Sequence, residues 1–216
     1  IKHAMQLLAM RSSITSLLFL LFFSSCGIST IKGLSEYNST ITEFSNPYFS
    51  DINTDYIYKA KINAYGNFFG GILIIKKIKN NNHRIVFITN FGNKIFDFEL
   101  LNDDIKIHYI MENLNRKIII NTLKSDFETL THEHNKVYKL LKKQQYSIYQ
   151  SKAKNRYNYY FVSTSTEELT EIIHTTKTKE KTIIKFNEIQ NRIAKTIKIQ
   201  HIKSPIKIDL TFIKNN

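Results

Sequence analysis

From Tyr56 onward, hydrophobic and polar residues alternate along most of the chain, and this period of two constrains the fold more than any other feature. In "YIYKAKINAY", residues 56–65, Tyr56, Tyr58 and Ile62 fall on one face, whereas Lys59 and Lys61 fall on the other. Such alternation is typical of a β-strand with one buried face. Similar segments recur as far as "PIKIDLTFI", separated by turn signals such as "NNN". Short connections leave no room for crossover helices, so they predict an antiparallel sheet with one apolar face.

In one segment the spacing of apolar residues changes from a period of two to that of a helix. In "NRKIIINTLKSDFETL", residues 115–130, apolar residues recur at helical spacing behind Asn115, a plausible N-cap. A further helix is predicted over "STEELTEIIHTT", residues 165–176. An amphipathic helix must bury its apolar stripe, and the apolar face of the sheet is the available surface. We therefore expect an α+β, mainly β fold: a large curved antiparallel sheet of about ten strands, with one to three helices across its concave face.

The most apolar run, "SLLFLLFFSSCG" at residues 16–27, contains the only cysteine. Its uncharged stretch is shorter than the roughly 20 residues of a membrane span but matches the apolar core of a signal peptide. Arg11 precedes it, and Phe23-Ser24-Ser25-Cys26 resembles the lipobox of bacterial lipoproteins. Residues 1–25 are thus expected to be a signal peptide whose true start is Met10. The resemblance implies that Cys26 carries a diacylglyceryl thioether and an N-acyl chain such as palmitate. The alternative is a buried strand with an inert thiol.

The residues after Cys26 bear on location and domain limits. Gly27 stands where an Asp would signal inner-membrane retention, and "GISTIKG" lacks the acidic residues of a known surface-export signal. By resemblance, the periplasmic face of the outer membrane is expected. Residues 26–54 are predicted to be the lipidated N-terminus and a tether, because they are rich in Ser, Thr and Asn without a sustained period; packing near "NPYF", residues 46–49, is the alternative for its second half. Residues 55–216 are predicted to form a single domain and the protein to be a monomer.

The charge of the chain is strongly positive. Without residues 1–25, 29 basic and 18 acidic residues remain, a net charge of +11. Such a domain can be drawn to phosphate groups of lipid, lipopolysaccharide or nucleic acid. A compositional origin is the alternative, since Lys, Asn and Ile, the residues of A/T-rich codons, crowd the chain. Export conflicts with nucleic-acid binding, so no nucleic-acid partner is expected.

The body resembles the LolA/LolB group of periplasmic lipoprotein carriers and outer-membrane lipoprotein receptors. The resemblance rests on "GGILIIKK…HRIVFITNFGNKIFDFELLNDDIKIHYI" followed by the helix at residues 115–130. It implies an open half-barrel capped by helices, whose apolar cavity holds acyl chains in lipoprotein localisation. The implied partners are outer-membrane lipids at Cys26, acyl chains of other lipoproteins and a periplasmic carrier protein. The receptor type also has an apolar membrane-contact loop, for which Phe68 and Phe69 in "NFFGG" are the candidates; alternatively, these two rings fold back into the core.

Several large apolar residues on the predicted inward faces are candidates for lining such a lipid-binding cavity. The alternative is that the same side chains fill a solid core. The candidates are Tyr56, Tyr58, Phe87, Phe96, Phe98, Ile119, Leu123 and Phe127.

Catalytic chemistry has little support. "THEHNK" places His132, Glu133 and His134 together but shows no third metal ligand. Neither a phosphate-binding Gly-rich loop nor a nucleophile-elbow motif is present. We expect a protein that is not an enzyme and has no cofactor or metal. The alternative to a lipid or lipoprotein binder is an anchored interaction subunit of an envelope assembly, with no ligand cavity.

Overall fold

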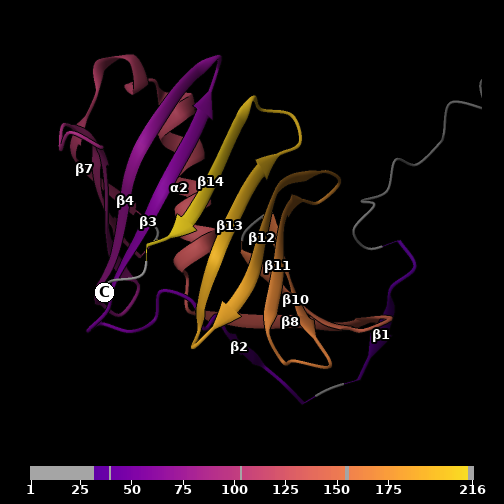
Figure 1. The fold of residues 1–216 in the computed structure, drawn as a ribbon. Coiled ribbons are helices and arrows are strands. Elements are labelled where there is room, and N and C mark those ends of the chain that lie inside the picture. The colour runs from indigo at the N-terminus through magenta and orange to yellow at the C-terminus, as the bar shows by residue number, and fades with distance from the viewer. Residues whose placement is uncertain (1–31, 39, 103, 154–155, 214–216) are drawn as a thin grey trace, which may run out of the picture.

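A computed structural model describes residues 32–213 except 39, 103 and 154–155. In this part of the chain, 14 strands form one curved antiparallel sheet around a single long helix, α2 (Lys117–Thr131), which follows the short 3₁₀ turn η2 (Glu112–Leu114) (Figure 1). The strands are β1 (Ser35–Tyr37), β2 (Glu43–Ser45), β3 (Asp55–Ala64), β4 (Asn67–Lys79), β5 (Asn82–Thr89), β6 (Lys94–Leu101), β7 (Asp104–Ile110), β8 (His134–Lys143), β9 (Tyr146–Ala153), β10 (Arg156–Ser163), β11 (Leu169–Thr176), β12 (Glu180–Gln190), β13 (Ile193–His201) and β14 (Ile206–Phe212).

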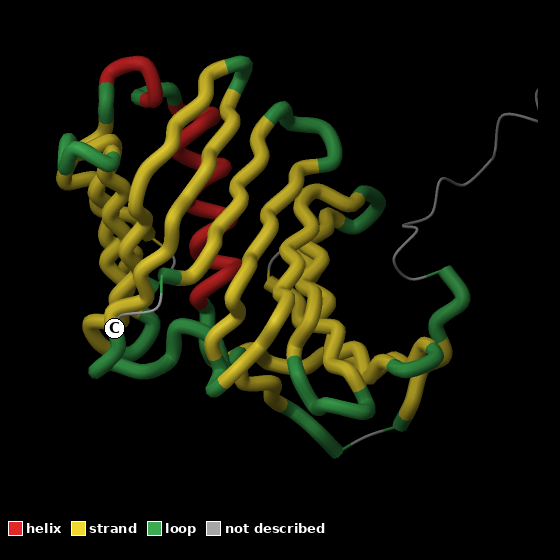
Figure 2. The backbone as a smooth tube through the Cα atoms, in the orientation of Figure 1, coloured by secondary structure: helices red, strands yellow, loops and turns green. Residues whose placement is uncertain are grey.

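The sheet is open. Its strand order is β1-β8-β9-β10-β11-β12-β13-β14-β3-β4-β5-β6-β7, with β2 also paired to β8. The end strands β1 and β7 do not pair with each other, so the sheet remains a half-barrel (Figure 2). The expected mainly-β class, the antiparallel pairing and the open curved sheet are confirmed.

The strand count of about ten was wrong, because the sheet has 14 strands. The predicted helix over residues 165–176 was also wrong: residues 169–176 form β11, which pairs with β10 and β12. β-Branched Ile172, Ile173 and Thr175 favour an extended backbone, and pairing on both sides outweighs the helix-start signal at Thr166. The described chain has one α-helix, and its N-cap is Arg116, without a side-chain cap, rather than Asn115.

Register aligns the apolar residues of neighbouring strands into rows. Ile172, Ile184, Ile199, Ile208 and Ile62 lie directly opposite one another across β11, β12, β13, β14 and β3. All five are buried. Directly opposed β-branched side chains stabilise an antiparallel sheet, so this isoleucine row holds the concave face together across five strands.

Helix α2 lies along the concave face of the sheet (Figure 2). Ile119, Leu123, Phe127 and Leu130 are at most 3% exposed and belong to the main hydrophobic core. The Phe127 ring lies 5.9 Å from that of Phe96 on β6. The helical stripe expected from sequence is thus buried against the sheet. Among the described residues, no helix combines the length and the apolar character needed to cross a bilayer.

The segment before β3 packs with the domain. Tyr48 and Phe49 are 2% and 1% exposed within the main core. The Tyr48 hydroxyl donates to the Leu169 carbonyl at 2.5 Å, and the Asn46 side-chain amide donates to the Leu130 carbonyl at 2.9 Å. Residues 43–50 of the predicted tether are therefore docked on the domain, in agreement with packing near "NPYF". The predicted signal peptide and Cys26 lie outside the described residues.

Candidate functional site

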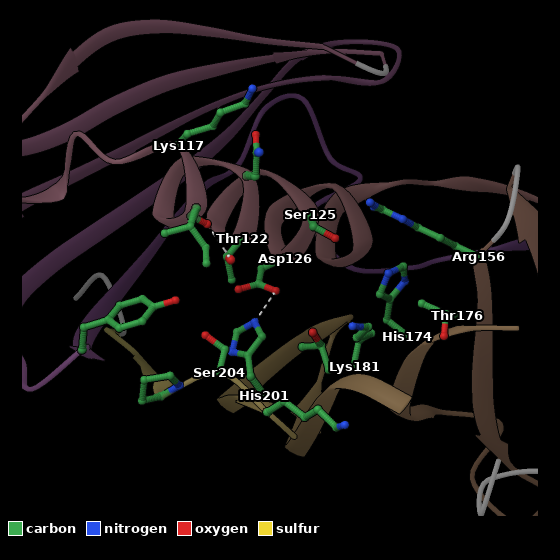
Figure 3. A pocket seen from close by; sticks show the side chains of 16 residues that line it. Lys117, Thr122, Ser125, Asp126, Arg156, His174, Thr176, Lys181, His201 and Ser204 are labelled. Atoms are coloured by element: carbon green, nitrogen blue, oxygen red, sulfur yellow. Dashed lines mark hydrogen bonds and ion pairs between the residues drawn. The ribbon is translucent and has the colours of Figure 1, made fainter. Parts of the chain in front are cut away.

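A cleft opens on one side of helix α2. Its volume is about 870 Å³, and it lies between α2, β10–β13 and the β13–β14 turn (Figure 3). A smaller pocket of about 310 Å³ adjoins it and shares Ser125, Arg156 and His174 with it. The residues that line the cleft are Tyr65, Lys117, Ile118, Asn121, Thr122, Ser125, Asp126, Arg156, His174, Thr176, Lys181, Thr182, His201, Lys203, Ser204 and Pro205.

The sheet contributes a polar row to this region. Ser151, Asn158, His174, Thr182 and His201 lie directly opposite one another across β9, β10, β11, β12 and β13. Side chains on one face of a strand recur every second residue, so this polar row is the neighbour of the isoleucine row on the concave face. The concave face therefore changes from apolar to polar within one step along β11–β13.

A buried ion pair joins the helix to the polar row. His201 Nε2 lies 2.9 Å from Asp126 Oδ1, and the two side chains are 6% and 1% exposed. His201 Nδ1 donates to the Ile206 carbonyl at 2.9 Å. Because a carbonyl only accepts, the proton between Nε2 and Oδ1 is an additional one that the pair shares. Asp126 Oδ2 has no hydrogen-bond partner among the described residues.

The surroundings of Asp126 and His201 raise the pKa of both side chains. Burial lowers the pKa of His201, but the hydrogen bond and the charge of Asp126 outweigh it and hold that pKa above its usual value. Burial raises the pKa of Asp126. Both shifts favour retention of the shared proton in the folded protein.

His174 lies next to the pair but is held neutral. Its Nδ1 donates to Asn158 Oδ1 at 2.6 Å, because an amide oxygen only accepts. Burial, followed by the charges of Arg156 and Lys181, lowers the pKa of His174 to about 4. At neutral pH its Nε2 is therefore an unprotonated nitrogen in a positively charged surrounding.

Positive charge dominates the cleft. Lys117, Arg156, Lys181 and Lys203 line it, whereas Asp126 is the one carboxylate among its lining residues. Within the described part of the chain, none of the four cations forms an ion pair with a carboxylate. Such a cleft attracts an anionic group and opposes a cationic one.

The predicted cavity residues occupy the other side of the helix. All eight are 4% exposed or less, all belong to the main core, and none lines the cleft. The rings of Phe96 and Phe98 stack at 4.6 Å, and Phe87 lies 5.4 Å from Phe96. The structure thus places these side chains in closely packed core, and their role in holding acyl chains stays a prediction. They are Tyr56, Tyr58, Phe87, Phe96, Phe98, Ile119, Leu123 and Phe127.

Phe68 and Phe69 belong to a strand and not to a loop. The turn between β3 and β4 consists of Tyr65 and Gly66, and β4 begins at Asn67. Gly66 has a φ of +83°, which suits the tight turn. Phe68 is 61% exposed at this end of the sheet, whereas Phe69 is partly buried and packs against the main core. Sequence alone placed the turn a few residues too late, because "FFGG" reads as a turn signal.

The histidine-rich segment after α2 has structural contacts. Glu133 Oε2 accepts from Lys77 Nζ at 2.5 Å, a pair whose side chains are 17% and 11% exposed. His134 Nδ1 lies 2.7 Å from Glu43 Oε1, and His132 lines the smaller pocket. Within residues 32–213, apart from the undescribed positions, no three or more potential ligands gather in a metal-binding group.

Sequence reasoning missed the residues that form the cleft. His201 ends the alternation Ile197-Ile199-His201, so its inward direction was readable from the strand. His174 was hidden because its segment was predicted to be helical. Asp126 stands at the edge of the apolar stripe, three residues after Leu123 and four before Leu130, so its burial was readable, but nothing in its spacing marks a partner on β13.

Comparison with known proteins identifies the fold. No family model and no curated protein matches the sequence. Among solved structures, the crystal structure of a LolA superfamily protein from Nitrosomonas europaea matches with a TM-score of 0.51 and 8% identity, covering 78% of this chain and 88% of that one. A domain from Vibrio parahaemolyticus, named for outer-membrane lipoprotein sorting, matches at 0.40 and 9%, covering 74% and 83%. The chain therefore has a fold like that of the LolA superfamily, the group that its sequence resembles.

Proposed function

We propose that this protein is a lipid-anchored envelope protein that takes up acyl chains, free or attached to lipoproteins, beneath helix α2. The observation that carries the proposal is the cleft of about 870 Å³ between α2 and the concave face. Ligand-binding clefts commonly measure about 300–1,000 Å³. Tyr65, Ile118 and Pro205 supply apolar surface at one end of the cleft. The likeness to the LolA superfamily fold supports a role in lipoprotein localisation.

The proposed anchor is Cys26, acylated after removal of residues 1–25, at the periplasmic face of the outer membrane. Several acyl chains on one cysteine give firm attachment, because each buried methylene contributes about 0.8 kcal/mol. Near the β3–β4 turn, Phe68 and Ile118 are 61% and 59% exposed, and Ile202 in the β13–β14 turn is 46% exposed. We propose that this end of the sheet touches the membrane, with Phe68 as its foremost contact.

A second candidate function is an anchored interaction subunit. Strand β7 pairs only with β6, and its Ile107 and Tyr109 are 39% and 44% exposed. An exposed edge strand with apolar side chains is a surface on which another chain can add a strand. Cross-linking in cells separates the two candidates: a stable stoichiometric partner at β7 favours the interaction subunit, and transient contact with many lipoproteins favours the binder.

The direct test uses the soluble form that lacks residues 1–26. After expression, native mass spectrometry should show bound lipid, and an apolar dye should compete with added fatty acid for one site. Substitution Thr122→Trp, which fills the cleft from the helix, should reduce uptake. Ile107→Trp on β7 is the matched control and should leave uptake unchanged. A protein that carries no lipid and does not bind the dye would overturn the proposal.

A further inference from the structure

The cleft has an electrostatic character that acyl-chain binding alone does not require. Arg156 extends from β10, and Lys181 lies at the start of β12; both line the cleft beside Ser125 of α2 (Figure 3). Lys117 and Lys203 line it as well. These four permanent cations outnumber the single lining carboxylate.

The one carboxylate does not balance them. Asp126 Oδ1 is already paired with His201 at 2.9 Å, and Asp126 is 2% exposed. Its charge is thus already balanced by His201 in the contact between the helix and the sheet. The four cations are exposed, so solvent screens their mutual repulsion, yet together they make the cleft electropositive and draw an anion to it.

The floor of the cleft offers a hydrogen-bond donor to such an anion. Ser204 Oγ is buried, lines the cleft, and is without a hydrogen-bond partner in the described part of the chain. Buried polar atoms are normally paired, so this unpaired hydroxyl indicates an occupant that would accept its proton.

The cleft is far larger than a single phosphate group, and its two ends differ. Arg156 marks one end on β10, whereas Tyr65 and Pro205 mark the other, beside β14 and β3. The apolar end adjoins the start of β4 and the β13–β14 turn, where Phe68 and Ile202 are exposed. A molecule with an anionic head and an apolar tail matches this polarity better than an inorganic ion does.

We infer that the cleft binds an anionic lipid, with the headgroup phosphate held by Arg156 and Lys181 above the polar row and the chains leaving past Tyr65 and Pro205. This inference rests on the proposed function, since it names the class of lipid that the cleft selects. Charge-assisted hydrogen bonds from the Arg156 guanidinium supply the main recognition, because a guanidinium matches the geometry of a phosphate.

The test compares two lipids of equal chain length on the full chain in neutral detergent. Phosphatidylglycerol and phosphatidylcholine are titrated separately, and native mass spectrometry counts the retained lipid. We expect about tenfold tighter retention of phosphatidylglycerol at low salt, since about 1.4 kcal/mol of charge interaction corresponds to that factor. The preference should shrink as salt screens the charges.

The variant Arg156→Gln/Lys181→Gln should lose the preference for phosphatidylglycerol while still retaining phosphatidylcholine. Lys198→Gln is the matched control: Lys198 is an exposed cation between the inward-facing Ile197 and Ile199, so it points away from the cleft. Circular dichroism checks folding, and Lys181→Gln alone serves if the double variant unfolds.

Each other outcome overturns the inference in a distinct way. Equal retention of both lipids overturns the anionic selection but leaves the proposed acyl-chain function standing. Tight binding of inorganic phosphate without retention of either lipid identifies a free anion as the ligand and overturns both. Loss of the preference in Lys198→Gln as well would assign it to overall charge and not to the cleft.

Discussion

The two sides of helix α2 face the same sheet but have different environments. Toward β3–β6, Leu123 and Phe127 meet closely packed aromatic rings, including Phe96. Toward β10–β13, Thr122 and Asp126 face a cleft lined by polar and basic side chains. The first side supplies stability through buried apolar area, and the second keeps space for a ligand at some cost in packing. One amphipathic helix thus borders both the packed core, which continues across β11–β13 as the isoleucine row, and the cleft that can bind a ligand.

The largest expected effect is on the packed side. Phe127→Ala should lower the free energy of unfolding by about 3–5 kcal/mol, because it removes a fully buried ring and leaves a cavity. Ile118→Ala on the same helix, where the side chain is 59% exposed, should change it by no more than about 0.5 kcal/mol. Urea unfolding followed by circular dichroism measures both. Similar losses in the two variants would show that the packed side is not the main source of stability.

The next effect concerns the contact between Asp126 and His201, which joins helix α2 to the polar row. Asp126→Ala should cost about 2–3 kcal/mol, because it leaves the buried His201 without its partner. The double variant Asp126→Leu/His201→Leu should recover much of this loss, since an apolar pair of similar size needs no counter-charge. Urea midpoints of the single variants and of the double variant measure these losses of stability. A double variant that loses more stability than the two single variants together would contradict the prediction.

A smaller effect distinguishes the polar row from the isoleucine row beside it. Ile184→Thr should cost about 1–3 kcal/mol, because it buries a hydroxyl in an apolar row. Thr182→Val, one step away on the same strand and facing the cleft, should change stability by no more than about 0.5 kcal/mol. Thermal unfolding of the two variants side by side measures the difference. Equal costs would mean that the boundary between the rows is misplaced.

The smallest effect is a dependence on pH. The pKa of His201 and that of Asp126 are both raised in the folded protein. The folded state therefore binds the shared proton more firmly than the unfolded state does. The resulting stability is complete below the unfolded pKa of histidine, about 6.5, and is lost as pH rises through the folded value. Urea midpoints between pH 6 and pH 9 should fall in the parent and change less in Asp126→Asn/His201→Gln; parallel curves would exclude the pair as their cause.

Sequence patterns predicted the packed side far better than the open one. Alternation in "YIYKAKINAY" and the stripe Ile119-Leu123-Phe127 report buried area directly, and burial is local to each element. The cleft depends on which strands the polar residues of α2 meet, and this is set by the sheet order and register. His174 and His201 are 27 residues apart but lie in one row, because β11 and β13 both pair with β12.

The N-terminal strands were missed for a related reason. β1 and β2 are three residues long, too short to show a period of two, and both form only because β8 offers an edge. Tyr48 and Phe49 show no pattern at all, yet they are buried. Pairing and burial supplied by distant elements are not visible in a short segment of sequence.

The contrast between the two sides of α2 is tested most directly by thiol reactivity at adjacent helix positions. The form that lacks residues 1–26 has no cysteine, so Thr122→Cys and Leu123→Cys each introduce a single thiol. We predict that the thiol at 122 reacts readily with a maleimide and is protected by added phosphatidylglycerol, whereas the thiol at 123 reacts only after unfolding. Equal protection of both thiols in the lipid-free protein would contradict an open cleft, and equal reactivity would contradict a packed core.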